Sequence, residues 1–259
     1  MKHIVIIGGG KGSAAVAENL KKTGAHISII HTPADDGGSA GTMRRAFKMI
    51  APGDVRRGLL ALSESKDTGL LEFFAHRYTA GPLQGEVVGN LMLAGLTLNH
   101  RGNFEKAIET MKKILQVKGD VIPASLKIPT LYSMLENGKT IKGEDNIYTP
   151  TYDPKLHIKK AWLKPRVPLN PKARQAIAKA DLIIIGPGSL FSSIIPNLLV
   201  TGMPAALKKS KAKIVYIINS ANQPGQTMGF TPEDHIKAVE QYLGTGVIDY
   251  ALKPAMPRP

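Results

Sequence analysis

Residues 2–30, KHIVIIGGGKGSAAVAENLKKTGAHISII, decide the fold class of this chain. The apolar run from Lys2 to Ile7 is typical of a strand buried on both faces of a parallel sheet. Gly8 to Gly12 predicts a tight turn, and Ser13 to Lys22 carries apolar residues at helical spacing. His26 to Ile30 is a second apolar strand. This strand–helix–strand unit predicts an α/β fold with a Rossmann-like, mostly parallel sheet.

The periodicity of the sequence changes twice further along the chain. Between about 42 and 117 the apolar residues follow helical spacing, whereas 121–163 consists of short extended pieces around an Asn-Gly hairpin signal. After Pro171 helices and strands alternate again. We therefore predict one Rossmann-like domain over residues 1–250. The helical segment and a small β-rich segment are inserted in it, and 251–259 forms a tail.

Three residues predict the starts of helices. Thr42 and Asp54 are interpreted as N-caps, and Thr231 precedes a proline at the first helical position. Val247 to Tyr250 is predicted as the last strand.

The composition restricts the classes of function. The chain has 259 residues, 43% hydrophobic content, no cysteine and a net charge of +14. No apolar run approaches the roughly 18 residues of a membrane span, and the first residues form a strand pattern rather than a signal peptide. A cytoplasmic protein without disulfides is therefore expected. The sequence leaves open whether the protein forms a homo-oligomer.

The excess positive charge does not point to a specific nucleic-acid site. The basic pairs are scattered, and there is little interleaving of aromatic with basic residues along the sequence. We therefore disfavour specific nucleic-acid binding and expect only weak attraction of polyanions. The seven histidines lack zinc-site spacing, so zinc is not expected.

Glycine-rich loops follow two of the predicted strands. In open parallel sheets, ligands bind outside the carboxyl ends of the strands. Backbone N–H groups at a helix start hold phosphates well, and a loose G-x-G-x-x-A also fits here. An acidic residue is missing after the second strand, which weakens an NAD site but leaves an NAD-like ligand open. The candidate phosphate-binding residues are Gly9, Gly10, Lys11, Gly12 and Ser13 in the first loop, and Gly186, Pro187, Gly188 and Ser189 in the second.

A third loop follows a later strand. Asn219 and Gln223 carry amides that could bind a base or sugar edge, although a plain surface loop is the alternative. Ser189 is interpreted as an N-cap that also faces a phosphate rather than as a nucleophile, since no G-x-S-x-G frame surrounds it.

The stretch 31–45, HTPADDGGSAGTMRR, lies just after the second predicted strand. Asp35 and Asp36 are candidate Mg²⁺ ligands, because Mg²⁺ prefers carboxylates combined with substrate phosphates. The alternative is an Asx-turn by one aspartate and a helix cap by the other. With Arg44, the two aspartates are also the candidate catalytic residues. The adjacent Gly37, Gly38 and Ser39 are candidate ligand contacts.

Six blocks of sequence together resemble the gluconeogenesis-factor family, within the wider 2-phospho-L-lactate transferase superfamily. The match extends from residue 3 to about 250, and the second and fifth blocks are highly specific. The blocks, in chain order, are IIGGGKGS, ADDGGSAGTMRR, PGDVRRGLLAL, GNLMLAGL, DLIIIGPGSLFSSIIPNLL and TPEDH.

The resemblance implies a nucleotide-diphosphate pocket, with Asn90 also projecting into it. In the transferase branch it implies transfer of a phospholactyl group from a guanosine diphosphate donor to a deazaflavin, with Mg²⁺. The gluconeogenesis-factor branch resembles instead binders of UDP-sugars such as UDP-N-acetylglucosamine, without a secure catalytic activity. That branch is linked to carbon metabolism, cell shape and peptidoglycan precursor supply.

The chain departs from the family pattern in three places. Ala40 stands where the family usually has serine, and Glu86 to Val88 replaces a Gly-His-Ser pattern. Typical members also continue for tens of residues past Lys253. The expected function is a nucleotide-sugar-binding regulator. A Mg²⁺-dependent, phospholactate-transferase-like enzyme with a nucleoside diphosphate donor is the alternative.

Overall fold

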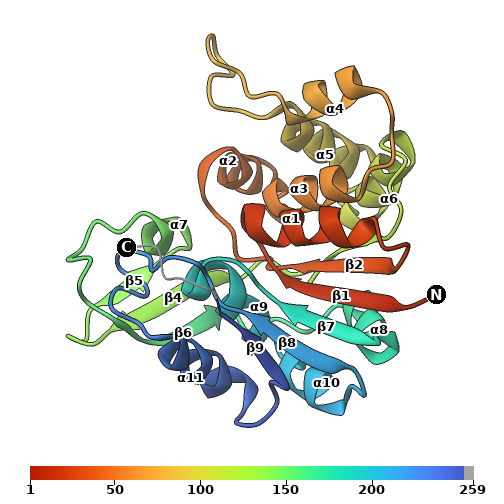
Figure 1. The fold of residues 1–259 in the computed structure, drawn as a ribbon. Helices are drawn as coiled ribbons and strands as arrows, with labels where there is room; N and C mark the ends of the chain where they lie inside the picture. Colours follow the sequence, from red (N-terminus) through yellow and green to blue (C-terminus); the bar gives the residue numbers. More distant parts are fainter. Residues whose placement is uncertain (254–259) are drawn as a thin grey trace.

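A computed structural model describes residues 1–253 and has a six-stranded main sheet (Figure 1). Every neighbouring pair of strands is parallel. This confirms the α/β fold with a mostly parallel sheet. The strands, in spatial order, are β3 (Asp120–Pro123), β2 (His26–His31), β1 (His3–Gly8), β7 (Leu182–Ile185), β8 (Lys213–Ile217) and β9 (Tyr250–Leu252).

Helices cover both faces of the main sheet, because alternate side chains of its strands enter two separate cores. Val5 and Ile7 pack on one face, and Ile4 and Ile6 pack on the other. The helices on the Ile6 face are α1 (Gly10–Lys21), α3 (Gly53–Leu62), α5 (Val88–Asn99) and α6 (Phe104–Ile114), with α2 (Gly38–Phe47) and α4 (Thr68–Ala75) beside α5. The Val5 face carries α8 (Pro171–Lys179), a π-helical turn (Leu190–Ile194), α9 (Ile195–Leu198), α10 (Met203–Lys209) and α11 (Pro232–Leu243).

A separate three-stranded antiparallel sheet lies beside the main sheet (Figure 1). Its central strand is β4 (Thr130–Leu135), flanked by β5 (Thr140–Lys142) and β6 (Ile158–Lys164), and α7 (Asp145–Tyr148) follows β5. β4 and β5 form the predicted Asn-Gly hairpin, and the inward side chains of this sheet join the Val5 core.

Several predicted boundaries change in the structure. Val121 does not open the β-rich insertion, since β3 pairs with β2 in the main sheet. Thr42 is not an N-cap: α2 already begins at Gly38, so Thr42 lies inside the helix. α1 begins at Gly10 rather than Ser13, because Gly10 to Gly12 form its first turn. The Thr231 N-cap is confirmed and forms a full capping box with Asp234.

The chain end also differs from the prediction. β9 spans Tyr250–Leu252, later than the predicted strand and inside the predicted tail, because it pairs with β8 from Val215 onward. Residues 254–259 of that tail lie outside the described residues. Among the helices of residues 1–253, none is long and apolar enough to cross a membrane.

Candidate functional site

The candidate site lies where the strand order of the main sheet reverses its direction. β1 and β7 are neighbours at the centre of the sheet, and their following helices pack on opposite faces. Ligands of open α/β folds bind at such switch points, outside the carboxyl ends of the strands. A cavity of about 660 Å³ lies there, and both glycine loops line it.

The two glycine loops touch each other, which only residues without side chains permit. A Cβ on Gly12 would lie 2.9 Å from the Pro187 carbonyl oxygen, and one on Gly188 would lie 3.2 Å from the Gly9 oxygen. The backbone of both loops therefore forms one continuous surface of the cavity.

Asp54 ties the first glycine loop to α3. Its Oδ1 accepts the Gly10 N–H at 2.9 Å and lies 2.7 Å from the Arg57 guanidinium nitrogen. The residue is buried, and a Cβ on Gly9 would lie 2.3 Å from its other oxygen. The prediction that Asp54 is a helix N-cap is wrong, since Pro52 occupies that position. The positive amino end of α1 stabilises the carboxylate at Gly10 instead.

Asp35 and Glu144, which we call the acidic wall, face the cavity with unusual proton affinity. Asp35 Oδ1 accepts the Gly37 N–H at 3.1 Å, which is the Asx-turn that the sequence allowed. Burial, and then the charge of Asp54, raises the pKa of Asp35 to about 7. Burial, and then the charge of Asp35, raises the pKa of Glu144 to about 9. A cation beside this wall would favour the ionised carboxylates.

The other two catalytic candidates do not line the cavity. Asp36 Oδ1 accepts the Asp145 N–H at 2.9 Å, so it holds the start of α7 rather than capping the helix near Ser39. Arg44 is buried and donates to the carbonyl oxygens of Asp35, at 2.7 Å, and of Pro129. Of the three candidates, only Asp35 faces the cavity.

Arg56, Arg57 and Arg77, the basic wall, line the same cavity and were not selected from the sequence. Arg56 is buried, and its Nε has no hydrogen-bond partner within residues 1–253. Burial, and then the charges of Arg57 and Arg77, lowers the pKa of Arg56 to about 10. A desolvated guanidinium beside two like charges favours an anionic ligand, since guanidinium donors pair strongly with phosphate.

Two buried amide oxygens of the cavity lack a partner among the described residues. Ser39 Oγ donates to Glu86 Oε2 at 2.7 Å and accepts from Asn90 Nδ2 at 3.0 Å, which leaves Asn90 Oδ1 free. Gln223 Oε1 is the second. Because unsatisfied buried acceptors cost free energy, both oxygens favour a ligand that donates hydrogen bonds.

The Asn219 side chain braces the second glycine loop. Its Oδ1 accepts the Gly188 N–H at 3.0 Å, and its Nδ2 donates to the Gly188 oxygen at 2.7 Å. Ser189 occupies the N-cap position of the π-helical turn without a side-chain capping bond.

Fourteen sequence-predicted residues come together around this cavity, and four do not. The residues that line it are Gly9, Gly10, Lys11, Gly12, Asp35, Gly37, Gly38, Ser39, Asn90, Pro187, Gly188, Ser189, Asn219 and Gln223. Those that do not are Ser13, Asp36, Arg44 and Gly186. The chemically important residues that sequence reasoning missed are Asp54, Arg56, Arg57, Arg77 and Glu144.

The predicted Mg²⁺ site keeps only one of its two predicted ligands, because Asp35 lines the cavity and Asp36 does not. Within the described chain, no group of three or more His, Cys, Asp or Glu side chains converges on one point. Asp35 and Glu144 supply two carboxylates, and Asp36 does not join them. Mg²⁺ commonly takes one or two carboxylates and completes its shell with phosphate oxygens and water, so the acidic wall suits an ion that arrives with a phosphate ligand.

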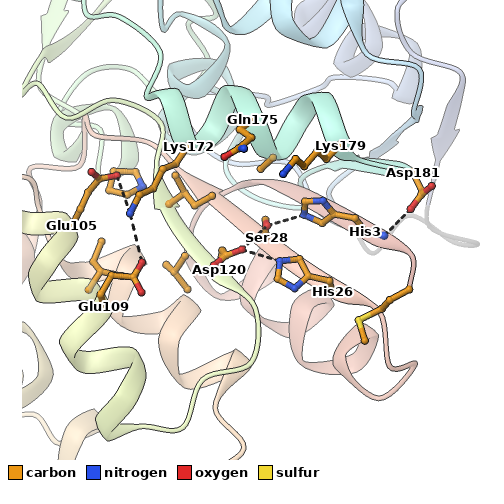
Figure 2. Close-up of a pocket in the computed structure, with 16 residues that line it drawn as sticks. His3, His26, Ser28, Glu105, Glu109, Asp120, Lys172, Gln175, Lys179 and Asp181 are labelled. Carbon is orange, nitrogen blue, oxygen red and sulfur yellow. Dashed lines mark hydrogen bonds and ion pairs between the residues drawn. The ribbon is translucent and has the colours of Figure 1, made fainter.

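A second cavity, of about 550 Å³, lies at the amino ends of β1, β2 and β3 (Figure 2). His26 Nε2 lies 2.8 Å from Asp120 Oδ2, and His3 Nε2 lies 2.8 Å from Ser28 Oγ. The Lys112 ammonium lies 2.8 Å from the other Asp120 oxygen. The charged groups around this second cavity are thus largely paired within the protein.

Comparison with known proteins identifies the family. The family model described as 2-phospho-L-lactate transferase CofD matches residues 4–257. A gluconeogenesis factor from Halalkalibacterium halodurans is 43% identical over 251 residues, which cover 96% of this chain and 76% of that protein. The chain belongs to the gluconeogenesis-factor family. Another member of this family, from Bacillus subtilis, is 42% identical over 96% of this chain and 77% of its own length.

A solved structure with the same fold is also similar to this chain in sequence. A crystal structure of a Bacillus halodurans protein superposes with a TM-score of 0.94 at 40% identity, covering 100% of this chain and 82% of that one. The resemblance inferred from the six sequence blocks is therefore confirmed, both for the family and for its place in the wider transferase family.

Proposed function

We propose that this member of the gluconeogenesis-factor family is a cytoplasmic regulator that binds a nucleoside-diphosphate sugar, such as UDP-N-acetylglucosamine, in the switch-point cavity. The observation that carries the proposal is the contact of two glycine loops in a cavity that the basic wall also lines. Diphosphates are commonly held at the amino end of a helix and by guanidinium groups, and the first turn of α1 and three arginines line this cavity. The link to carbon metabolism, cell shape and peptidoglycan precursor supply is part of the same proposal.

Each wall of the cavity has a role in this proposal. The glycine loops, Lys11 and the basic wall would hold the diphosphate. Asn90 Oδ1 and Gln223 Oε1 would accept hydrogen bonds from the hydroxyl or imide donors of the sugar and base. The acidic wall would hold Mg²⁺, which neutralises phosphate charge when it is bound.

Thermal unfolding with a panel of ligands tests the proposal. UDP-N-acetylglucosamine, UDP-glucose, GDP and NAD are each added with and without Mg²⁺. A ligand at a hundredfold excess over its dissociation constant stabilises the fold by about 2.7 kcal/mol. Arg77→Ala should reduce the response to the uridine ligand, whereas Arg166→Ala, which lies outside the cavity, should not. No shift with any uridine ligand would contradict the proposal.

The pKa of Asp35 favours a second candidate function, a group transferase. A carboxyl with a pKa of about 7 is well suited to accept a proton from an attacking hydroxyl. In that reaction the acceptor oxygen bonds to phosphorus, the bond from phosphorus to the nucleotide oxygen breaks, and Asp35 takes the hydroxyl proton. Asp35→Asn should then abolish turnover while largely preserving nucleotide binding. Absence of turnover in the unmodified protein, with deazaflavin and other hydroxyl acceptors, removes this candidate.

A further inference from the structure

The outer face of the small antiparallel sheet gathers aromatic and basic side chains from its three strands. Leu131, Ser133 and Leu135 point inward and are buried, so the alternate residues of β4 point outward. The strand pairing places Tyr132 opposite both Lys142 and Trp162. One row across the three strands is therefore lysine, tyrosine and tryptophan.

The two aromatic rings of this row form a stacked pair. The Tyr132 and Trp162 ring centroids are 5.7 Å apart, and the ring planes differ by 11°. Both residues are partly exposed. A planar aromatic group can stack on the outer side of such a pair, and base–aromatic stacking contributes about 1–3 kcal/mol per base.

Lysines surround the stacked pair without acidic neighbours in the outward positions. Lys160 and Lys164 flank Trp162 along β6, about 13 Å apart at strand spacing, and Lys142 closes the row on β5. All three lysines are exposed, and none takes part in an ion pair with another residue of 1–253. The outward positions of the sheet are Thr130, Tyr132, Met134, Thr140, Lys142, Lys160, Trp162 and Lys164.

We propose that this lysine–aromatic face (Tyr132, Lys142, Lys160, Trp162 and Lys164) binds single-stranded nucleic acid without sequence preference. A base stacks on the aromatic pair while the phosphates before and after it reach Lys160 and Lys164. Lysines bind phosphates as point charges, so they attract the backbone and do not read the bases.

Trp162 is the only tryptophan of the chain, so its fluorescence reports on this face alone. A 20-nucleotide oligothymidine should quench this fluorescence in a saturable way. A duplex of the same length should bind more weakly, because its bases are already stacked on one another. With a fluorescently labelled oligothymidine and anisotropy as the readout, Trp162→Phe should retain part of the affinity, whereas Trp162→Ser should lose more of it.

Two triple variants, each of which removes three positive charges, distinguish binding by this face from attraction by the overall positive charge of the protein. The face variant K142A/K160A/K164A should bind oligothymidine at least tenfold more weakly, and its plot of log affinity against log salt should be shallower by about 2. The control, K66A/K209A/K211A, removes three exposed lysines elsewhere and should bind almost as the parent does.

Four results would overturn the proposal. They are an absence of tryptophan quenching by oligothymidine, equal loss of affinity in both triple variants, equal affinity for duplex and single strand, and preferential binding to vesicles of phosphatidylcholine and phosphatidylserine. The last result would assign the face to an anionic membrane surface.

Discussion

The two ends of the parallel sheet carry cavities of similar size. They differ in whether their charged and polar groups have partners within the protein. The carboxyl-end cavity contains an acidic wall with raised pKa values and buried polar atoms without partners among the described residues. At the amino end, the cavity-lining carboxylates of Glu105, Glu109, Asp120 and Asp181 each have a hydrogen-bond or ion-pair partner (Figure 2). Volume therefore does not distinguish a binding site here, whereas unsatisfied charge and hydrogen-bonding capacity do.

Gly9→Ala should have the largest effect on stability, because it places a methyl group in the closest contact of the carboxyl-end cavity. The new Cβ would lie 2.3 Å from Asp54 Oδ2, so Asp54 and Gly10 must move apart. We expect a loss of about 2 kcal/mol in the free energy of unfolding, measured with urea, together with loss of ligand-induced stabilisation. Gly95→Ala is the matched control: its Cβ meets open space within α5, so stability should rise by up to about 1 kcal/mol. Equal effects of the two substitutions would refute the tight contact.

Asp120→Asn tests the amino-end cavity, where the charge pairs stabilise the fold. The substitution weakens the contacts to Lys112 and His26, both at 2.8 Å. Because Asp120 is half exposed, we expect a loss of only about 1–1.5 kcal/mol in the free energy of unfolding. Affinity for UDP-N-acetylglucosamine, measured by calorimetry, should be unchanged. A large loss of affinity would mean that the two cavities are energetically coupled.

Glu144→Gln should stabilise the ligand-free protein, in contrast to Gly9→Ala and Asp120→Asn. Burial, and then the charge of Asp35, means that Glu144 must take up a proton on folding at pH 8, whereas glutamine needs none, so the ligand-free variant should gain about 1 kcal/mol, seen as a rise of roughly 2–4 °C in Tm. The same variant should lose the part of the ligand response that depends on Mg²⁺. Chelation with EDTA should then change nothing further. Destabilisation of the ligand-free variant would contradict the raised pKa of Glu144.

The pH dependence of stability should show the smallest but most diagnostic difference. The folded pKa values of Asp35 and Glu144, about 7 and about 9, exceed their ordinary values, so their stabilising contribution is lost as pH rises from about 4 to 9. Burial lowers the pKa of His3 at the other cavity, so its contribution is present above pH 6.5 and is lost as pH falls. Because two carboxyls outweigh one histidine, the Tm of the parent should fall from mildly acidic pH toward pH 9. Glu144→Gln should flatten the alkaline side, and His3→Gln should flatten the acidic side.

Local sequence patterns predicted the main sheet and much of the carboxyl-end cavity. The apolar run before Gly8 and the run before Gly186 each precede a glycine loop, and both signals are confined to a few consecutive residues. The Asn-Gly hairpin and the Thr231 capping box are local in the same sense. Such features depend on backbone conformation and burial, which short sequences encode directly.

The parts that could not be predicted depend on contacts between distant segments. Asp54 resembles a helix N-cap in sequence, and only the position of α1 shows that its carboxylate belongs to Gly10. Glu144 follows a short strand of the small sheet, and nothing in its neighbourhood indicates that it meets Asp35. The predictions that Asp36 and Arg44 face the ligand were wrong. Their side chains bind backbone atoms of other segments, and the sequence does not reveal these contacts.

The bond from Asp36 to Asp145 also bears on the order in which the chain folds. The Gly10–Asp54 bond joins residues 44 apart in sequence, whereas the Asp36–Asp145 bond joins residues 109 apart. Closing the longer loop costs about 0.8 kcal/mol more in chain entropy. The first glycine loop and Asp54 can therefore come together within the first quarter of the chain, before the second glycine loop joins them. The side that carries Glu144 must wait until the small sheet docks, and the cavity is complete only at that late step of folding.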